Sequence, residues 1–385
     1  MFDFDCAPDR RNTLSVKWTT YPEDVLPMWV ADMDFLAPQP VREALAARVS
    51  HGIFGYDFST TALAEAVSAW LLRRFGWAVS PEAVLFTPGV VSTMNLVLRT
   101  FAAPGDAAVV FTPIYPPFLH APSQQGLQLI PVPLAEDEQA CPRYTIDFDA
   151  LERALTPRAR VLLLCHPHNP VGREWTRDEL LRLAELCLRH DLLICSDEIW
   201  GDLALGEGTH VPFAALSPEV GQRCVTLMAP SKTFNLPGLG LSFAVVQNPL
   251  LRGRLAQAAI GTLPHVNGLA LVAAQAAYSA CDDWLDALRA YLTANCNFLL
   301  SFVRAEMPSL RVCAPEATYL AWLDCRHALD GQSPYSFFLT QARVALSDGA
   351  GFGAGGTGWV RLNFGCPRSQ LRTALERMRD ALRSL

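Results

Sequence analysis

The sequence lacks the features that mark several classes of protein. It has no basic stretch of the kind that follows a nucleic-acid backbone, and its formal net charge is −7. No uninterrupted apolar run approaches the roughly 18 residues of a membrane span. The first residues, "MFDFDCAPDRR", lack the basic and apolar regions of a signal peptide. We therefore expect a cytosolic protein that binds neither nucleic acid nor membranes.

The cysteines and histidines show no ligand spacing. The eleven cysteines include no CxxC pair, and most lie in apolar runs, where a free thiol packs as a small hydrophobic side chain. The eight histidines lack the spacing of a zinc site, since His166 and His168 lie beside a proline-rich turn and not on a helix face. We expect reduced core cysteines and no metal.

Strand and helix patterns alternate through the middle of the chain. The apolar run "VLLLC" (161–165) precedes "TRDELLRLAELCLRH", where Thr176 and Glu179 form a capping-box pattern before apolar residues at helical spacing. The apolar segments "DLLIC" and "RCVTLM" (223–228) follow. Upstream, "VLFTPGVVSTMNLVLRTF" predicts a strand, a glycine turn and a helix. This βαβ rhythm predicts an α/β fold with a mostly parallel sheet covered on both faces.

The pattern changes near residue 281. From there the sequence predicts one long helix that ends at Pro308, and the strand-like "TYLAWLDC" and "WVRLNF" then alternate with polar helices. We expect a large domain over residues 46–280, a smaller α+β domain over 281–385, and an arm over 1–45 that forms part of the smaller domain.

A glycine-rich stretch, "GAGFGAGG" (349–356), contains a GxGxxG match. A dinucleotide site needs a strand before this motif and a helix after it, whereas here a strand follows. We expect no nucleotide site there.

Polar residues follow four of the apolar runs. Because ligands bind at the carboxyl ends of strands in α/β sheets, these residues are candidates for a site. They are Gly89 with Val90 and Val91 at a helix start, Asn169 in "HPHNPVG", Asp197 in "SDEIW" and Lys232 in "SKTFN". Taken singly, each has an ordinary alternative as a helix entrance, a turn residue, a cap or a solvated charge.

Arg361 is harder to explain as an ordinary surface residue, since it lies inside the apolar run "WVRLNFG". A buried guanidinium needs an anion, which either a structural ion pair or a ligand could supply.

One ligand accounts for the whole set. Pyridoxal 5'-phosphate has a phosphate, an aldehyde, a phenolic oxygen and a ring nitrogen, which the helix start at Gly89, Lys232, Asn169 and Asp197 would serve in turn. The planar fork of Arg361 suits a substrate carboxylate.

The motifs also carry a resemblance. "HNPVG", "SDEIW", "SKTFN" and "RLNFG", in this order and spacing, resemble the fold type I aminotransferase superfamily of pyridoxal phosphate enzymes. Within it, "LPMWVADMDF", "HGIFGY", "TPIYPPF" and "TYLAWLDCR" are similar to the MalY/PatB group of carbon–sulfur β-lyases. The resemblance covers essentially the whole chain and implies a large α/β domain, a smaller α+β domain and pyridoxal 5'-phosphate as cofactor.

The resemblance also implies residue roles. Lys232 would form the Schiff base, Asp197 would pair with the pyridinium nitrogen, and Tyr115 would stack on the ring, which makes these three the catalytic candidates. The other cofactor contacts would come from Asn169 on the phenolic oxygen, Trp200 nearby, Ser231 and the amides of Val90 and Val91 beside Gly89 on the phosphate, and Tyr56 from a neighbouring subunit. Arg361, Asn169 and Ala31 would meet the substrate. The implied protein is a homodimer with shared active sites.

Four positions depart from the superfamily pattern. Ala229 and Gly240 stand where many aminotransferases have a serine and an arginine on the phosphate, which puts tight phosphate binding in doubt. Trp200 replaces a tyrosine, and indole can donate one N–H but cannot become a phenolate. His166 stands where Asn is expected, and the sequence offers no reason for it.

The implied activity is α,β-elimination of cystathionine or a related S-substituted cysteine to a thiol, pyruvate and ammonia. An aminotransferase of the same superfamily is the closest alternative, since it uses the same lysine, aspartate and arginine. A regulatory protein that retains the fold is a second, because some relatives bind a transcription regulator, although Lys232, Asp197, Asn169 and Arg361 together argue against loss of catalysis. The sequence does not determine the preferred sulfur substrate.

Overall fold

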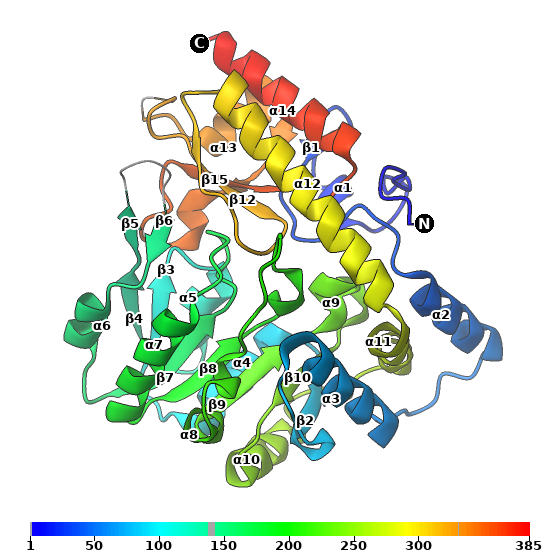
Figure 1. Cartoon of the computed structure of the whole chain (residues 1–385), viewed down its shortest axis with the longest axis vertical. Helices are drawn as coiled ribbons and strands as arrows, with labels where there is room; N and C mark the ends of the chain where they lie inside the picture. Colours follow the sequence, from blue (N-terminus) through cyan, green and yellow to red (C-terminus); the bar gives the residue numbers. More distant parts are fainter. Residues whose placement is uncertain (1, 138–142, 330) are drawn as a thin grey trace.

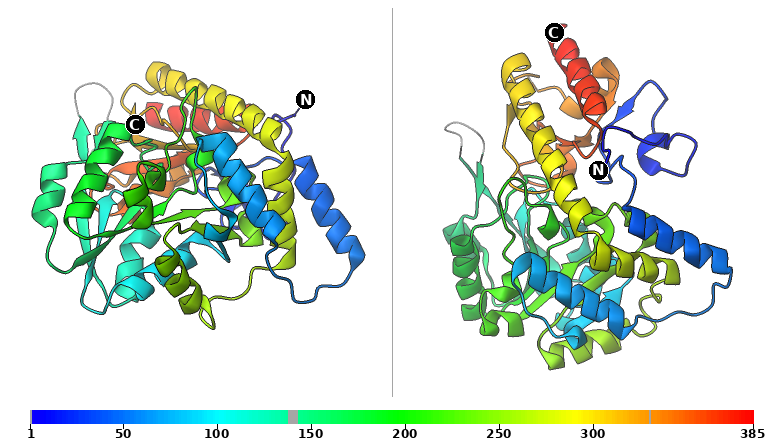
Figure 2. Two further views of the ribbon diagram at one scale, coloured as in Figure 1. Left: turned by 60° about the horizontal axis from the view of Figure 1, so that its bottom comes forward. Right: turned by 45° about the vertical axis from the view of Figure 1, so that its right-hand side comes forward.

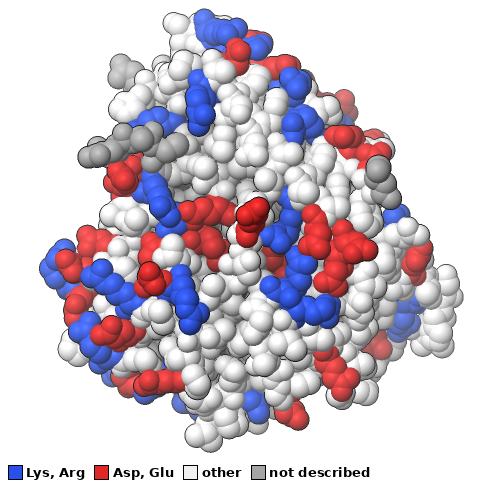
Figure 3. Space-filling view, in the orientation of Figure 1, with Lys and Arg blue, Asp and Glu red and all other residues white. Residues whose placement is uncertain are grey.

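The computed structural model describes residues 2–137, 143–329 and 331–385 (Figure 1). Cys141 therefore lies outside the described residues. None of the described cysteines forms a disulfide, and all of them except Cys6 are buried. Among the described residues, no helix combines the length and apolar character that a membrane span requires. On the face shown in Figure 3, basic and acidic side chains are interspersed across the middle of the molecule.

A seven-stranded sheet forms the centre of the larger part of the molecule, in the order β2-β10-β9-β8-β7-β3-β4. The strands are β2 (Val84–Thr87), β3 (Ala107–Thr112), β4 (Gln128–Pro133), β7 (Ala159–Cys165), β8 (Leu193–Asp197), β9 (Cys224–Met228) and β10 (Ser242–Val245). Only β10 pairs antiparallel with its neighbours; the other pairs are parallel. The predicted mostly parallel sheet is confirmed.

Helices cover both faces of this sheet (Figures 1 and 2). On β7, Val161 and Leu163 pack into one apolar cluster, whereas Leu162 and Leu164 pack into another on the opposite face, as the alternation of side chains along a strand requires. The first cluster contains α4 (Val90–Phe101), α5 (Pro116–Gln124) and α10 (Pro249–Ala259). The second contains α3 (Thr61–Phe75), α6 (Phe148–Ala154), α7 (Arg177–Arg189), α8 (Pro218–Gln222) and α11 (Gly268–Ala280).

The predicted start of α7 is confirmed in detail. The Thr176 hydroxyl accepts a hydrogen bond from the Glu179 N–H (3.2 Å), and the Glu179 carboxylate accepts one from the Thr176 N–H (2.8 Å). This capping box satisfies two backbone donors that the first helical turn cannot. It fixes the loop that connects β7 to α7.

A second sheet, in the order β11-β12-β15-β14, belongs to the C-terminal part. Its strands are β11 (Arg311–Val312), β12 (Leu320–Asp324), β14 (Ser347–Asp348) and β15 (Trp359–Asn363). Helix α12 (Asp282–Glu306) runs from the end of α11 to α14 (Arg368–Arg383), beside which it packs (Figure 1). The long helix predicted before Pro308 is therefore confirmed.

The N-terminal segment joins the C-terminal part through β1 (Leu26–Pro27), which pairs parallel with β13 (Val344–Ala345). The remaining elements are α1 (Val16–Thr19), α2 (Gln39–His51), β5 (Ala135–Asp137), β6 (Arg143–Thr145), α9 (Pro230–Thr233) and α13 (Pro334–Phe337). The domain limits at residues 45 and 280 stay predictions; the first falls within α2 and the second at the junction of α11 and α12.

Candidate active site

The strand ends converge on a cavity of about 750 Å³. It lies where the β2, β3, β7, β8 and β9 connections meet β15 and the segment that follows β1. All the sequence-predicted site residues except Tyr56 line it: Ala31, Gly89, Val90, Val91, Tyr115, Asn169, Asp197, Trp200, Ser231, Lys232 and Arg361. Residues that are up to 330 positions apart in the sequence therefore share one site.

Asp197 ends strand β8 in a buried position. Its Oδ1 accepts a hydrogen bond from the Ile199 N–H (3.1 Å). Burial raises the pKa of this carboxyl to about 7, and the nearby charge of Lys232 lowers it only in part. A cation beside Asp197 would restore its ionisation.

Lys232 lies in the short helix α9, directly after β9. Its Nζ donates a hydrogen bond to the Ala31 carbonyl (2.7 Å) and lies 5.5 Å from the centre of the Trp200 ring. Burial, and next the charge of Arg361, lowers the pKa of the amine to about 8. A substantial fraction of Lys232 is therefore neutral and nucleophilic near pH 8.

Arg361 is buried in β15 and is held by neutral groups. Its Nη1 donates to Asn169 Oδ1 (2.9 Å), and its Nη2 donates to the Trp29 carbonyl (3.0 Å) and the Ser347 hydroxyl (3.1 Å). Its buried Nε has no hydrogen-bond partner, and no acidic side chain pairs with it within the described part of the chain. Burial lowers the pKa of this guanidinium to about 10. These features favour the ligand alternative over the structural ion pair.

The contact with Arg361 also settles the direction of the Asn169 amide. Because Oδ1 accepts from Arg361, the Nδ2 group remains available as a donor toward the cavity. The Asn169 backbone carbonyl accepts from the Tyr115 N–H (3.1 Å), which fixes the start of α5 next to it.

Helix α4 begins at the edge of the cavity. Gly89 is its N-cap in an extended conformation, and its carbonyl accepts from both the N–H and the hydroxyl of Thr93 (3.0 and 2.7 Å). The N–H groups of Val90 and Val91, in the first turn, have no intrahelical acceptor and are suited to an anion. Ser231 lines the same cavity.

Three of the four departures from the superfamily pattern, Ala229, Gly240 and Trp200, lie at this cavity. Ala229 and Gly240 line it without a polar side chain, and Gly240 has φ of +65°, a backbone conformation that favours glycine. The buried Trp200 ring packs edge-on against Tyr319, with 4.8 Å between ring centres.

Tyr319 is a site residue that the sequence did not reveal. Its hydroxyl donates to the Ala31 carbonyl (3.0 Å), the same oxygen that accepts from Lys232. Its segment, "TYLAWLDC", contributed a strand pattern and part of the family resemblance, but neither assigned a role to Tyr319. Tyr319 itself does not line the cavity and contacts the site through Ala31 and Trp200. Tyr21 and Tyr335, whose hydroxyls are 3.1 Å apart, do line it and were likewise missed.

The structure also shows where the glycine-rich stretch and Tyr56 lie relative to the cavity. Gly351 and Phe352 of the glycine-rich stretch line the cavity just before β15, and Phe352 packs under the Arg361 guanidinium at 5.0 Å. Tyr56 lies fully exposed in the loop between α2 and α3 and does not line the cavity. Its predicted contact with a neighbouring subunit stays a prediction.

His166 now has a structural explanation. Its backbone N–H donates to the Asp197 carbonyl (2.9 Å), and its buried ring places Nε2 3.1 Å from the Val211 carbonyl. Burial lowers the pKa of this imidazole. The side chain therefore faces away from the cavity and into the protein.

Comparison with known proteins agrees with this geometry. Residues 23–378 match the family "aminotransferase class I and II". Cystathionine beta-lyase PatB of Bacillus subtilis is 41% identical over 388 residues, which cover 99% of this chain and 100% of PatB. Protein MalY of Escherichia coli is 34% identical over 395 residues, which cover 100% of both chains.

A solved structure of a relative also matches this chain over its whole length. Cystalysin from Treponema denticola, whose structure contains a pyridoxal 5'-phosphate cofactor, matches with a TM-score of 0.95 and 32% identity over 100% of this chain and 99% of that chain. The chain therefore belongs to the class I and II aminotransferase family of fold type I, in the group that contains PatB and MalY.

Proposed function

We propose that this protein is a pyridoxal 5'-phosphate-dependent carbon–sulfur β-lyase that converts cystathionine or a related S-substituted cysteine to a thiol, pyruvate and ammonia. The observation that carries the proposal is the buried Arg361 guanidinium, which has no acidic partner among the described residues and shares one cavity with Lys232 and Asp197. The 41% identity to cystathionine beta-lyase PatB over almost the whole chain supports elimination as the reaction.

The donors around the cavity fit pyridoxal 5'-phosphate. The Asp197 carboxyl, whose pKa burial raises to about 7, suits a protonated ring nitrogen that would return it to the ionised state. The free Nδ2 of Asn169 suits the phenolic oxygen, and the first-turn amides of α4 with Ser231 suit the phosphate. Tyr115, at the start of α5, supplies an aromatic face for stacking.

When bound, the cofactor supplies an electrophilic aldehyde and an electron-accepting ring. Lys232 would hold the cofactor through Nζ, and the same amine would take the proton from the substrate Cα. Its pKa near 8 allows both roles at neutral pH. The hydrogen bond to the Ala31 carbonyl holds this amine at the cavity wall.

Arg361 binds the substrate carboxylate and so orients the Cα–H bond toward Lys232. Asn169 keeps the guanidinium plane in place through Nη1. The thiolate would leave from Cβ, and water would then release pyruvate and ammonia. This reaction would need no keto-acid acceptor, which separates it from transamination.

We also propose that the protein acts as a cytosolic homodimer with shared sites. The loop between α2 and α3 supports this, because Ile53, Phe54, Tyr56 and Phe58 are all exposed on it. Exposed apolar clusters of this kind mark interaction surfaces, and a second copy would bring Tyr56 to the partner's phosphate site.

The test combines pyruvate release with chemical trapping. Purified protein supplied with pyridoxal 5'-phosphate should release pyruvate from cystathionine and S-alkyl cysteines in the absence of any keto acid. Dependence on a keto-acid acceptor would instead identify an aminotransferase.

The lysine content makes the trapping experiment selective. Lys17 and Lys232 are the only lysines in the sequence, and Lys17 is buried in an ion pair with Asp34 (2.7 Å). Borohydride reduction followed by peptide mapping should place the cofactor on Lys232. Label on Lys17, or on neither lysine, would contradict the assignment.

A further inference from the structure

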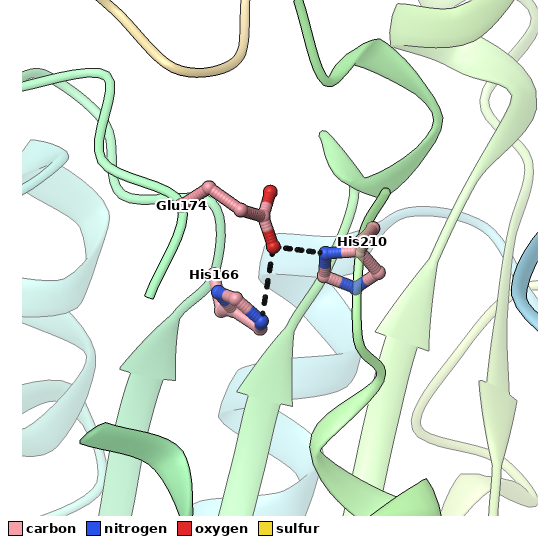
Figure 4. Close-up of side chains that lie close together, drawn as sticks. All are labelled: His166, Glu174 and His210. Carbon is pink, nitrogen blue, oxygen red and sulfur yellow. Dashed lines mark hydrogen bonds and ion pairs between the residues drawn. The ribbon is translucent and has the colours of Figure 1, made fainter. Parts of the chain in front are cut away.

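Two buried histidines and a partly buried glutamate from separate segments meet beside the strand ends that carry the active site (Figure 4). His166 follows β7, Glu174 lies in the loop before α7, and His210 lies between β8 and β9. Glu174 Oε1 is 3.3 Å from His166 Nε2 and 2.8 Å from His210 Nδ1. One ligand atom from each residue lies within 4.8 Å of those of the other two.

A second carboxylate fixes the orientation of His210. Its Nε2 is 2.8 Å from Glu198 Oε2, and Glu198 is itself held by the Ser196 hydroxyl (2.7 Å) and the Phe213 N–H (3.0 Å). A histidine that ligates a metal typically donates its other ring nitrogen to a carboxylate in this way. The arrangement directs Nδ1 toward Glu174.

One polar atom of the cluster is not satisfied by a protein partner and could meet an ion. Glu174 Oε2 is buried and has no hydrogen-bond partner among the described residues, although buried polar atoms nearly always have one. In addition, Glu174 Oε1 and the Val211 carbonyl, which are both acceptors, approach the same His166 nitrogen, at 3.3 and 3.1 Å. Acceptors that converge in this way favour a cation between them.

We propose that His166, Glu174 and His210 bind one divalent transition-metal ion, with zinc as the best match. Two imidazole nitrogens and one carboxylate oxygen form a typical zinc donor set, whereas calcium and magnesium prefer oxygen ligands. The Val211 carbonyl or a water would complete four-coordination. This inference goes beyond the lyase function, because the ion does not take part in elimination.

Two of the three separations between ligand atoms are close to those of a zinc site, and the third lies within 4.8 Å. Zinc–ligand bonds of about 2.0–2.1 Å in a tetrahedron put neighbouring ligand atoms roughly 3.3 Å apart. The separation of His166 from Glu174 already matches at 3.3 Å, and the 2.8 Å separation of His210 from Glu174 would widen. His210 contacts both the Glu174 and the Glu198 carboxylates, and the ion would share with it the compensation of their negative charge.

The location gives the ion a structural role. Glu198 follows Asp197 directly, and the His166 N–H donates to the Asp197 carbonyl (2.9 Å). A metal here would tie together the connections after β7 and β8, which present Asn169 and Asp197 to the cavity. Its main effect would be on stability, since ligands that bind only the folded state stabilise it.

The experiment measures metal binding directly. Tag-free holoenzyme carrying Cys6→Ser, which removes the exposed thiol, is stripped with a chelator and titrated with Zn²⁺ in a calorimeter. We expect one ion per chain with a dissociation constant of about 1 µM or tighter, together with an increase in Tm. Cobalt at the same site should give a tetrahedral visible spectrum without a thiolate charge-transfer band.

Matched variants locate the ion. His166→Asn and Glu174→Gln should each weaken Zn²⁺ binding at least tenfold and abolish the increase in Tm. His190→Asn and Glu152→Gln alter an exposed pair of the same residue types, 3.8 Å apart, and should change neither. Cofactor absorbance and circular dichroism report whether each variant is folded. Absence of saturable one-to-one binding, or unchanged affinity in both cluster variants, would overturn the proposal and leave a hydrogen-bonded network only.

Discussion

Two buried groups of charges in this protein differ in how their charges are compensated. In the N-terminal cluster, Asp34 accepts hydrogen bonds from Arg10 (2.6 Å), Lys17 (2.7 Å), Trp18 (2.8 Å) and Gln370 (2.9 Å). In the cavity, Arg361 has no acidic partner among the described residues, and Asp197 accepts from one backbone N–H. The first group is complete within the chain, whereas the second is open to a ligand.

The pKa shifts of the two groups differ in the same way as their partners do. Burial alone would raise the pKa of Asp34, but the charge and hydrogen bond of Lys17 lower it below its ordinary value. In the cavity, burial prevails: it raises the pKa of Asp197 to about 7 and lowers those of Lys232 and Arg361 to about 8 and about 10. A structural cluster therefore stabilises its own charges, and a binding site leaves that to the cofactor and the substrate.

The largest effect is expected for Lys232→Ala. Because Lys232 is both the attachment point and the proton acceptor, its loss should reduce pyruvate release on the order of 10³-fold or more. A coupled assay for pyruvate under saturating cystathionine measures this directly. Turnover close to that of the wild type would show that another group takes the proton.

Arg361→Met should reduce kcat/KM for S-substituted cysteines by about 10²- to 10³-fold, since it removes the charge that meets the substrate carboxylate. The free energy of unfolding of the cofactor-free protein should change by less than about 1.5 kcal/mol. Removing an unpaired buried charge offsets the loss of the hydrogen bonds to Asn169, Trp29 and Ser347. Steady-state kinetics and urea unfolding on the same preparation measure both.

Lys17→Met is the matched change in the N-terminal cluster. In contrast to Arg361→Met, it should reduce the stability of the protein and leave its activity unchanged. It breaks a buried ion pair whose side chains are each 1% exposed, which should lower the free energy of unfolding by about 3 kcal/mol. The kcat of the folded protein should remain, because Lys17 does not line the cavity. A stable variant with a large kinetic defect would remove the distinction between the two groups.

The sequence predicted the parts of the site that depend on one strand and its following turn. Apolar runs that end in Gly89, Asn169, Asp197 and Lys232 locate the carboxyl edge of a parallel sheet, which the structure confirms as one cavity wall. Arg361 was found because a charge inside an apolar strand needs a partner. These signals are local, so a single sequence contains them.

Contacts between distant segments could not be predicted in the same way. The Ala31 carbonyl receives Lys232 and Tyr319 from positions 201 and 288 residues away, and no pattern within any of these segments indicates the meeting. The cluster of His166, Glu174 and His210 was missed for the same reason, since its members are not at ligand spacing in the sequence. The predicted contact of Tyr56 needs a second copy of the chain, and a single sequence does not show where that copy would lie.

The smallest effect is expected when Asp197 or Asp34 is replaced by asparagine. The two aspartates should make the folding stability depend on pH with opposite signs. Because burial raises the pKa of Asp197 from 3.8 to about 7, the cofactor-free folded protein keeps a proton that the unfolded chain loses as the pH rises between these values. Its stability therefore falls across that range, and Asp197→Asn should remove the loss, with a gain on the order of 2 kcal/mol above pH 7.

Asp34→Asn provides the opposite case. The pKa of Asp34 is lowered in the folded state, so its contribution is present above the unfolded pKa of about 4 and is lost as the pH falls. This variant should be destabilised at pH 8 and approach the wild type at low pH. Urea unfolding of both variants without cofactor at pH 3, pH 5 and pH 8 tests the signs, because Asp34 titrates below about pH 4 and Asp197 between about pH 4 and pH 7. The same sign for both would mean that Asp197 is already compensated within the chain, and a ring cation would then not be needed to keep it charged.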